Sequence, residues 1–181
     1  DNQRLVIKPA SSSGIFIQMV DGSAPPALGW SPWTGNATFQ FSPNMLTAAE
    51  TAGNNFRVTE LGTGTVLLTN AGFAANAWTV KYTPDGTMFV AQNLTDFVVF
   101  STASWTVIKH QPTAVWGFAA SRIEFTDDSK TMILINTGFN PGDAASRYFI
   151  VDTETWEGEY SDISIPDEFV YKNNALALLD F

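Results

Sequence analysis

Residues 80–90 read Val-Lys-Tyr-Thr-Pro-Asp-Gly-Thr-Met-Phe-Val, and this stretch decides the fold. Apolar residues flank a Pro-Asp-Gly cluster, in which proline presets φ and glycine tolerates a left-handed conformation. Similar segments begin at Phe39 and Ile123, each with its own turn cluster. All three predict an antiparallel hairpin, whose strands we call A and B. We expect the B strands to begin with the apolar residues at 45–46, 88–90 and 132–135.

A second type of hairpin, with strands C and D, sets the repeat length. It begins at Leu5, Phe56, Phe97 and Tyr148. These starts lie 51, 41 and 51 residues apart, and the two longer intervals contain insertions at 21–36 and 137–146. Without the insertions the period is about 40 residues, the length of one four-stranded propeller blade.

The chain therefore reads as C-D, three A-B-C-D units and a final A-B hairpin. This order predicts an all-β fold, a β-propeller-like array of about four four-stranded antiparallel blades. We expect one domain over 1–181, with repeats at 37–76, 77–120 and 121–168 and a split blade made of 169–181 plus 1–20. Alternatively, the chain is part of a larger propeller or of a ring completed by another copy.

Two predicted strands, 97–100 and 132–135, are apolar at every position. A sheet with one face in water alternates apolar and polar residues, so both faces of these strands must be covered. Radially stacked blades cover both faces. Segment 45–53 is the one place where a short helix competes with a strand.

Two segments resemble the repeats of WD-repeat-like and YVTN-like β-propeller proteins. They are 82–90, Tyr-Thr-Pro-Asp-Gly-Thr-Met-Phe-Val, and 151–156, Val-Asp-Thr-Glu-Thr-Trp. The resemblance covers most of 37–181, without the Gly-His and Trp-Asp dipeptides of true WD repeats. It implies a rigid interaction platform, the role of most such proteins, while a minority are enzymes. A fold alone does not choose between these roles.

Charge and cysteine content argue against several classes of protein. A net charge of -9, from 18 acidic and 9 basic residues, opposes nucleic-acid binding, which needs clustered Lys and Arg. The chain has no cysteine, which excludes a disulfide scaffold or a thiolate metal site. No apolar run approaches the ~20 residues that cross a bilayer, so we expect no membrane insertion. The sequence opens on Asp1, so we expect it to be processed or excised from a longer protein.

Acidic residues concentrate in 121–168, which holds 11 of the 18 and three basic residues, a net charge of -8. One interpretation is carboxylate chemistry in a carbohydrate-active or calcium-dependent enzyme. The segment 152–159 does not fit an EF-hand loop, because Trp156 and Glu157 stand where Asp or Asn and then Gly are required. The other interpretation is a solvated acidic edge of one blade. His110 is the only histidine, and we expect an ordinary loop residue.

Several further residues have a simple structural interpretation. Trp105 and Trp156 occupy matching positions after their C-D turns, which predicts a packing role. Trp78 and Trp116 border blade starts, and we expect them to pack as well. The tripeptide Asn93-Leu94-Thr95 matches the glycosylation acceptor pattern, which arises easily by chance.

The two insertions are the candidate recognition loops. Segment 21–36 combines prolines, which stiffen a free loop, with tryptophans, which are frequent interface anchors. Its two tryptophans alternatively plug the groove between two blades. Segment 137–146 is likewise either a recognition loop or a long connection between strands B and C. The candidate binding residues are Pro25, Pro26, Trp30, Trp33, Phe139 and Asn140.

The sequence thus predicts a non-enzymatic binding or assembly module that contacts partner proteins through loops 21–36 and 137–146. We expect no cofactor, and a partner that is another protein or further copies of this chain. Low charge and abundant Thr, Ala and Asn favour an extracellular or virion structural component. The alternative is the carbohydrate-active or calcium-dependent enzyme with carboxylates from 121–168.

Overall fold

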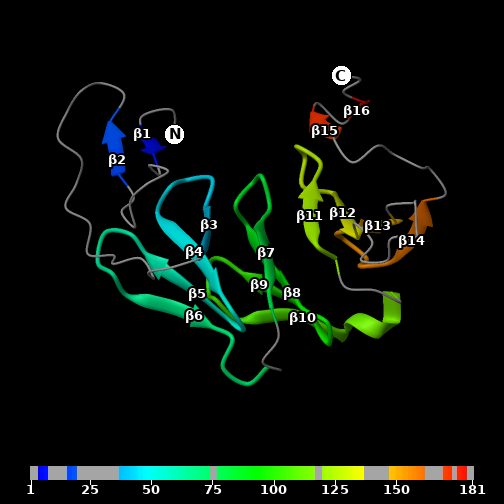
Figure 1. Ribbon diagram of the computed structural model, residues 1–181, viewed down its shortest axis with the longest axis horizontal. Helices are drawn as coiled ribbons and strands as arrows, with labels where there is room; N and C mark the ends of the chain where they lie inside the picture. Colours follow the sequence, from blue (N-terminus) through cyan, green and yellow to red (C-terminus); the bar gives the residue numbers. More distant parts are fainter. Residues whose placement is uncertain are drawn as a thin grey trace. The chain divides into compact units, whose positions relative to one another are not determined.

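The computed structural model describes residues 4–7, 16–19, 37–73, 77–116, 120–136, 147–161, 169–172 and 175–178. Within these residues the fold is all-β, and the only helical element is the 3-10 turn η1 (Thr113–Trp116). The chain divides into two compact units, Asp1–Trp78 and Thr79–Phe181. This division lies two residues from the predicted boundary between the first two full repeats. Figure 1 labels the strands of both units.

The first unit contains a hairpin and a four-stranded antiparallel sheet. The hairpin pairs β1 (Arg4–Ile7) with β2 (Phe16–Met19). The sheet has the order β3-β4-β5-β6, each strand pairing with the next along the chain. Its strands are β3 (Thr38–Phe41), β4 (Thr47–Ala52), β5 (Asn55–Glu60) and β6 (Val66–Thr69).

The second unit contains two four-stranded antiparallel sheets and a second hairpin. The first sheet consists of β7 (Thr79–Tyr82), β8 (Met88–Gln92), β9 (Asp96–Ser101) and β10 (Val107–Pro112). The second consists of β11 (Arg122–Phe125), β12 (Thr131–Asn136), β13 (Arg147–Asp152) and β14 (Gly158–Ser161). The hairpin pairs β15 (Phe169–Lys172) with β16 (Ala175–Leu178).

The predicted all-β fold with four-stranded antiparallel sheets is therefore confirmed, one sheet in each of the repeats 37–76, 77–120 and 121–168. The two terminal hairpins are two-stranded sheets of their own. In segment 45–53 the strand β4 forms, and no helix. The prediction that this strand begins at Met45 was wrong: Met45 has φ of 56° and belongs to the turn, because the strand's pairing begins at Thr47.

The three A-B turns share one hydrogen-bond pattern, which explains their common sequence. In the turn after β7, the Thr83 hydroxyl donates to Asp85 Oδ1 at 2.6 Å and accepts from the Met88 N–H at 3.0 Å. The Asp85 carboxylate also accepts from the Thr87 N–H. Gly86 follows with φ of 73°, which glycine adopts without strain. The matching residues are Ser42, Asn44 and Met45 in the first sheet and Thr126, Asp128 and Ser129 in the third.

The three C-D turns also match, and each is fastened to the A-B turn of its own sheet. Gly64, Trp105 and Trp156 hold the same left-handed position, and each donates its N–H to a carbonyl four residues earlier. The Thr102 hydroxyl donates to the Gly86 carbonyl at 2.6 Å, and the Thr153 hydroxyl donates to the Ser129 carbonyl at 2.7 Å. The two hairpins of a repeat therefore form one structural unit at this end.

In the second unit the two four-stranded sheets meet along their first strands, β7 and β11. Lys81 Nζ lies 3.1 Å from Glu124 Oε2, and the Thr79 hydroxyl donates to the Ala120 carbonyl at 3.2 Å. The rings of Phe97 and Trp156 pack at 5.8 Å between centroids. The shared core consists of Val90, Phe97, Val99, Ala120, Ile123, Phe125, Met132, Leu134, Phe149 and Val151.

Candidate functional site

All six residues proposed from the sequence as binding residues lie outside the described part of the chain: Pro25, Pro26, Trp30, Trp33, Phe139 and Asn140. The described strands nevertheless show where the two insertions join the sheets. Segment 21–36 leads into β3 near Thr38, which pairs with Thr51 at the end of the sheet opposite the A-B turn. Segment 137–146 joins Asn136 to Arg147, a pair at the same end of its own sheet.

Each four-stranded sheet therefore has two chemically distinct ends. We call the end that carries the A-B and C-D turns the turn end. The opposite end, where strand A begins, B meets C, and D finishes, we call the loop end. Both insertions join their sheets at the loop end. This placement follows from the up-and-down order of the strands, and it makes the loop end the candidate recognition surface.

The loop end of sheet β7–β10 carries exposed apolar side chains on a rigid support. Leu94 is 71% exposed and Val115 is 65% exposed, the highest values for large apolar residues in the described part of the chain. Leu94 lies in the turn between β8 and β9, and Val115 lies in η1. Thr113 holds the two segments together, because its hydroxyl donates to the Asn93 carbonyl at 3.0 Å and its N–H donates to the Thr95 carbonyl at 2.9 Å.

Asn93 fixes the turn that presents Leu94. The Asn93 side chain is 2% exposed, and its Oδ1 accepts hydrogen bonds from the N–H groups of Thr95 and Asp96 and from the Thr95 hydroxyl. An acceptor asparagine for glycosylation lies on an accessible surface loop. Asn93 is committed to the turn, so the tripeptide 93–95 has a structural role.

His110 lies near this end, but its contacts do not make a catalytic triad. Its Nε2 lies 2.9 Å from Asp96 Oδ1, and the Thr95 hydroxyl donates to Asp96 Oδ2 at 2.7 Å. In a triad the imidazole stands between the hydroxyl and the carboxylate, so that it can remove the hydroxyl proton. Here the carboxylate stands in the middle and the hydroxyl points its proton at Asp96. The arrangement orients a turn and activates no nucleophile.

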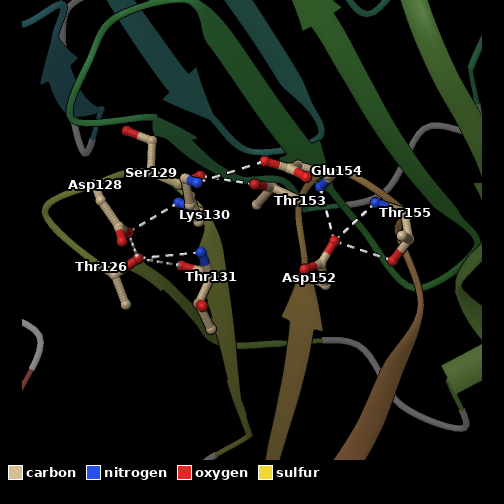
Figure 2. Close-up of polar contacts among 9 residues, drawn as sticks. All are labelled: Thr126, Asp128, Ser129, Lys130, Thr131, Asp152, Thr153, Glu154 and Thr155. Carbon is tan, nitrogen blue, oxygen red and sulfur yellow. Dashed lines mark hydrogen bonds and ion pairs between the residues drawn. The ribbon is translucent and has the colours of Figure 1, made fainter.

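The turn end of sheet β11–β14 is acidic, and its carboxylates bind the chain's own backbone (Figure 2). Asp128 accepts from the Lys130 N–H and from the Thr126 hydroxyl. Asp152 accepts from the N–H groups of Glu154 and Thr155 and from the Thr155 hydroxyl. The hydrogen bonds from Thr155 hold the pKa of Asp152 below its ordinary value. These contacts are those of turn-stabilising residues.

The other described carboxylates of 121–168 are paired or widely spread. Glu124 lies between Lys81 and Arg122 Nε, at 3.1 and 2.6 Å, and Glu154 lies 3.7 Å from Lys130. A shallow depression beside β14 is lined in part by Asp152, Glu157 and Glu159. Within the described segments, no three acidic or histidine side chains converge in a way that could hold a metal ion.

The tryptophans behave as the sequence indicates wherever their side chains are described. Trp105 packs on Phe89 with 6.2 Å between ring centroids, and Trp156 packs on Phe97. Trp78 packs edge-to-face on Phe56 at 5.0 Å. The packing role predicted for these three tryptophans is confirmed, and the Trp116 side chain lies outside the described residues.

Sequence reasoning missed Leu94 and Val115. The usual rule places apolar residues in the core, so nothing in a short apolar-polar pattern marks these two as exposed. The available signal was their position in connections that, by strand order, join the same end of a repeat as the two insertions.

Comparison with known proteins adds no relatives. The chain matches no family model and shows no significant sequence similarity to a curated protein. In the described residues, no helix has the length and apolar character needed to cross a membrane.

Proposed function

We propose that this chain is a non-enzymatic, β-propeller-like binding or assembly module that recognises partner proteins with the loop ends of its sheets. In this proposal the three four-stranded sheets are blades, and the two terminal hairpins supply the halves of a further blade. A larger or intersubunit propeller is the alternative arrangement. The proposal keeps the resemblance of 82–90 and 151–156 to WD-repeat-like and YVTN-like repeats as its family assignment.

The arrangement within the second unit supports the blade interpretation. Its two sheets meet along their first strands through Lys81 and Glu124, as neighbouring blades do when strand A is innermost. The outer strands β6 and β10 each follow a register irregularity, a device that protects sheet edges from pairing with other chains. Such sheets are built to stack face to face, with their loops free for recognition.

One observation carries the choice of recognition surface. Leu94 and Val115 are the most exposed large apolar side chains of the described residues, and both lie at the loop end of sheet β7–β10. Insertions 21–36 and 137–146 join their own sheets at the corresponding end. If the sheets are blades of one propeller, all loop ends lie on one face, so these features form one surface.

Composition indicates the chemistry of the partner. A net charge of -9 favours a partner with a basic rim, and added salt weakens such an attraction. No cofactor enters the proposal. The chain's low charge and its lack of cysteine support an extracellular or virion structural component as its setting.

Cross-linking to proteins in an extract of the source tests the recognition surface. The variant Leu94→Ser/Val115→Ser and the variant Trp30→Ala/Trp33→Ala are each expected to reduce partner capture at least tenfold, with thermal melting unchanged. Val107→Ser/Ile108→Ser is the matched control, because it removes about half-exposed apolar residues from the outer strand β10. Equal capture by all three variants and the parent chain contradicts the proposal.

A further inference from the structure

The terminal hairpins β1–β2 and β15–β16 are each only two strands wide, with four residues in each strand. A two-stranded hairpin of this length is marginally stable by itself in water. Each hairpin also presents an edge with unpaired backbone groups, the kind of edge that proteins cover or pair. By strand order, β1–β2 is a C-D hairpin and β15–β16 is an A-B hairpin. Each therefore has the half of a repeat that the other lacks.

The sequence of β1 is that of a central strand. Leu5, Val6 and Ile7 are apolar at three consecutive positions, so both faces of the strand are apolar. The matching residues of β9 are Phe97, Val98 and Val99, and all three are fully buried because β8 and β10 flank that strand. An edge strand with one exposed face alternates apolar and polar residues instead. Strand β1 thus fits a position between two other strands.

All three complete sheets pair strand B with strand C in the same register. The pairs at the second position of these strands are Ala49–Val58, Val90–Val99 and Ile133–Ile150. Their B-strand members also pair with strand A, opposite Gln40, Lys81 and Glu124. In the last hairpin the residue at this position is Ala177, which pairs with Val170. In β1 the residue matching Val58 and Val99 is Ile7.

We infer that β16 pairs antiparallel with β1 of the same chain, with Ala177 opposite Ile7, which completes a four-stranded sheet in the order β15-β16-β1-β2. This inference rests on the propeller arrangement proposed above, and it specifies the partner and register of its closing contact. Pairing within the chain is favoured because the two hairpins are covalently linked, which gives them a high effective concentration for each other.

The pair Ile7–Ala177 is suited to disulfide trapping. In the first sheet a two-residue turn joins β4 to β5, and Ala52 pairs with Asn55 beside it. Hydrogen-bonded and non-hydrogen-bonded pairs alternate from such a turn, which makes Ala49–Val58 a non-hydrogen-bonded pair with closely spaced side chains. The matching pair Ile7–Ala177 then has a Cα separation of about 4.5 Å, within the range that a disulfide spans.

The test uses the 181-residue chain, which has no cysteine of its own. The variant Ile7→Cys/Ala177→Cys is oxidised and compared with Val6→Cys/Ala177→Cys. The control differs by one residue, and neighbouring residues of a strand point to opposite faces, so its cysteines cannot meet. Non-reducing electrophoresis, mass in solution and circular dichroism are recorded for both variants.

We expect the first variant to form a disulfide within one chain in at least ten times the yield of the control, at monomer mass and with a raised melting temperature. Disulfides only between copies overturn pairing within the chain. Equal yields from both variants overturn the register, and no disulfide in a natively folded first variant overturns the contact. Loss of this contact with partner capture still dependent on Leu94 and Val115 leaves the recognition proposal standing, so the two failures are distinguishable.

Discussion

The hydroxyl of Thr153 donates a hydrogen bond to the carbonyl oxygen of Ser129 at 2.7 Å, which fastens the C-D turn of sheet β11–β14 to its A-B turn. Thr153 is 7% exposed, so water does not replace this contact. Thr102 makes the same bond to Gly86 in sheet β7–β10. In the first sheet Leu61 holds the matching position, and its N–H donates to the Leu46 carbonyl. The hydroxyl contact is therefore a specific addition to a common backbone contact.

Replacing Thr153 with valine is expected to lower the free energy of unfolding by about 1–2 kcal/mol, because the Ser129 carbonyl loses its partner in a buried place. Thr106→Val is the matched control, since Thr106 is exposed and bonds only to Ser104 among the contacts recorded for it. We expect the control to change stability by no more than about 0.5 kcal/mol. Urea unfolding measures both variants, and equal losses contradict the assigned role.

A pH-dependent contribution to stability is expected from Asp85. Burial raises the pKa of this carboxyl, but hydrogen bonds from Thr83, Thr87 and Ser129 outweigh burial and hold the pKa below its ordinary value of 3.8. A carboxyl with a lowered pKa in the folded state adds stability above its unfolded pKa of about 3.9. That stability is lost as the pH falls through the folded pKa.

The variant Asp85→Asn tests this contribution, because Asn44 serves the same turn in the first sheet and shows that an amide fits. We expect the variant to fold and to lose less melting temperature than the parent chain between pH 7 and pH 3. Glu159→Gln removes one exposed carboxylate and serves as the control for net charge. A parent chain and Asp85→Asn variant with the same acid dependence contradict the prediction.

The repeat could be predicted from the sequence because its signals are local. Pro84, Asp85 and Gly86 each have an intrinsic turn preference, and the flanking apolar residues fix the strands around them. The same reasoning failed at Met45, where an apolar side chain indicated a strand. The hydrogen bonds of Ser42 and Asn44 set that turn and require φ of 56° at Met45, and side-chain polarity does not reveal such a requirement.

The candidate site was less predictable because it depends on contacts between distant segments. Leu94 and Val115 are exposed because Asn93 and Thr113 hold their two connections away from the core. Asn93 is buried by the same contacts, which a three-residue glycosylation pattern cannot reveal. The position of both insertions at the loop end follows from strand order alone, so that part was accessible from the sequence.

Gly158 is expected to tolerate no side chain, although it lies at the exposed start of β14. A Cβ atom there would lie 2.5 Å from Phe149 Cε1 and 2.7 Å from the Ile150 carbonyl oxygen. Gly158→Ala should therefore cost about 1–3 kcal/mol of stability by overpacking. Gly62 offers a matched control, because a Cβ there meets nothing within 4 Å. Urea unfolding should show no loss for Gly62→Ala, and a similar result for Gly158→Ala contradicts the steric argument.

Calcium is expected to leave the stability of the chain unchanged apart from its effect on ionic strength. Segment 121–168 carries a net charge of -8, so any salt reduces repulsion among its carboxylates. Specific binding needs several oxygen ligands around one ion. Asp128 and Asp152 instead accept hydrogen bonds from their own turns, and Glu124 is paired with Lys81.

Thermal melting in calcium chloride and in sodium chloride of equal ionic strength separates screening from binding. We expect equal melting temperatures in the two salts, with and without chelator, and the same result for Asp152→Asn. A ligand that binds only the folded chain raises the melting temperature in proportion to its excess over Kd. A calcium-specific rise of several degrees, reversed by chelator and lost in Asp152→Asn, would therefore favour the calcium-dependent enzyme over the recognition module.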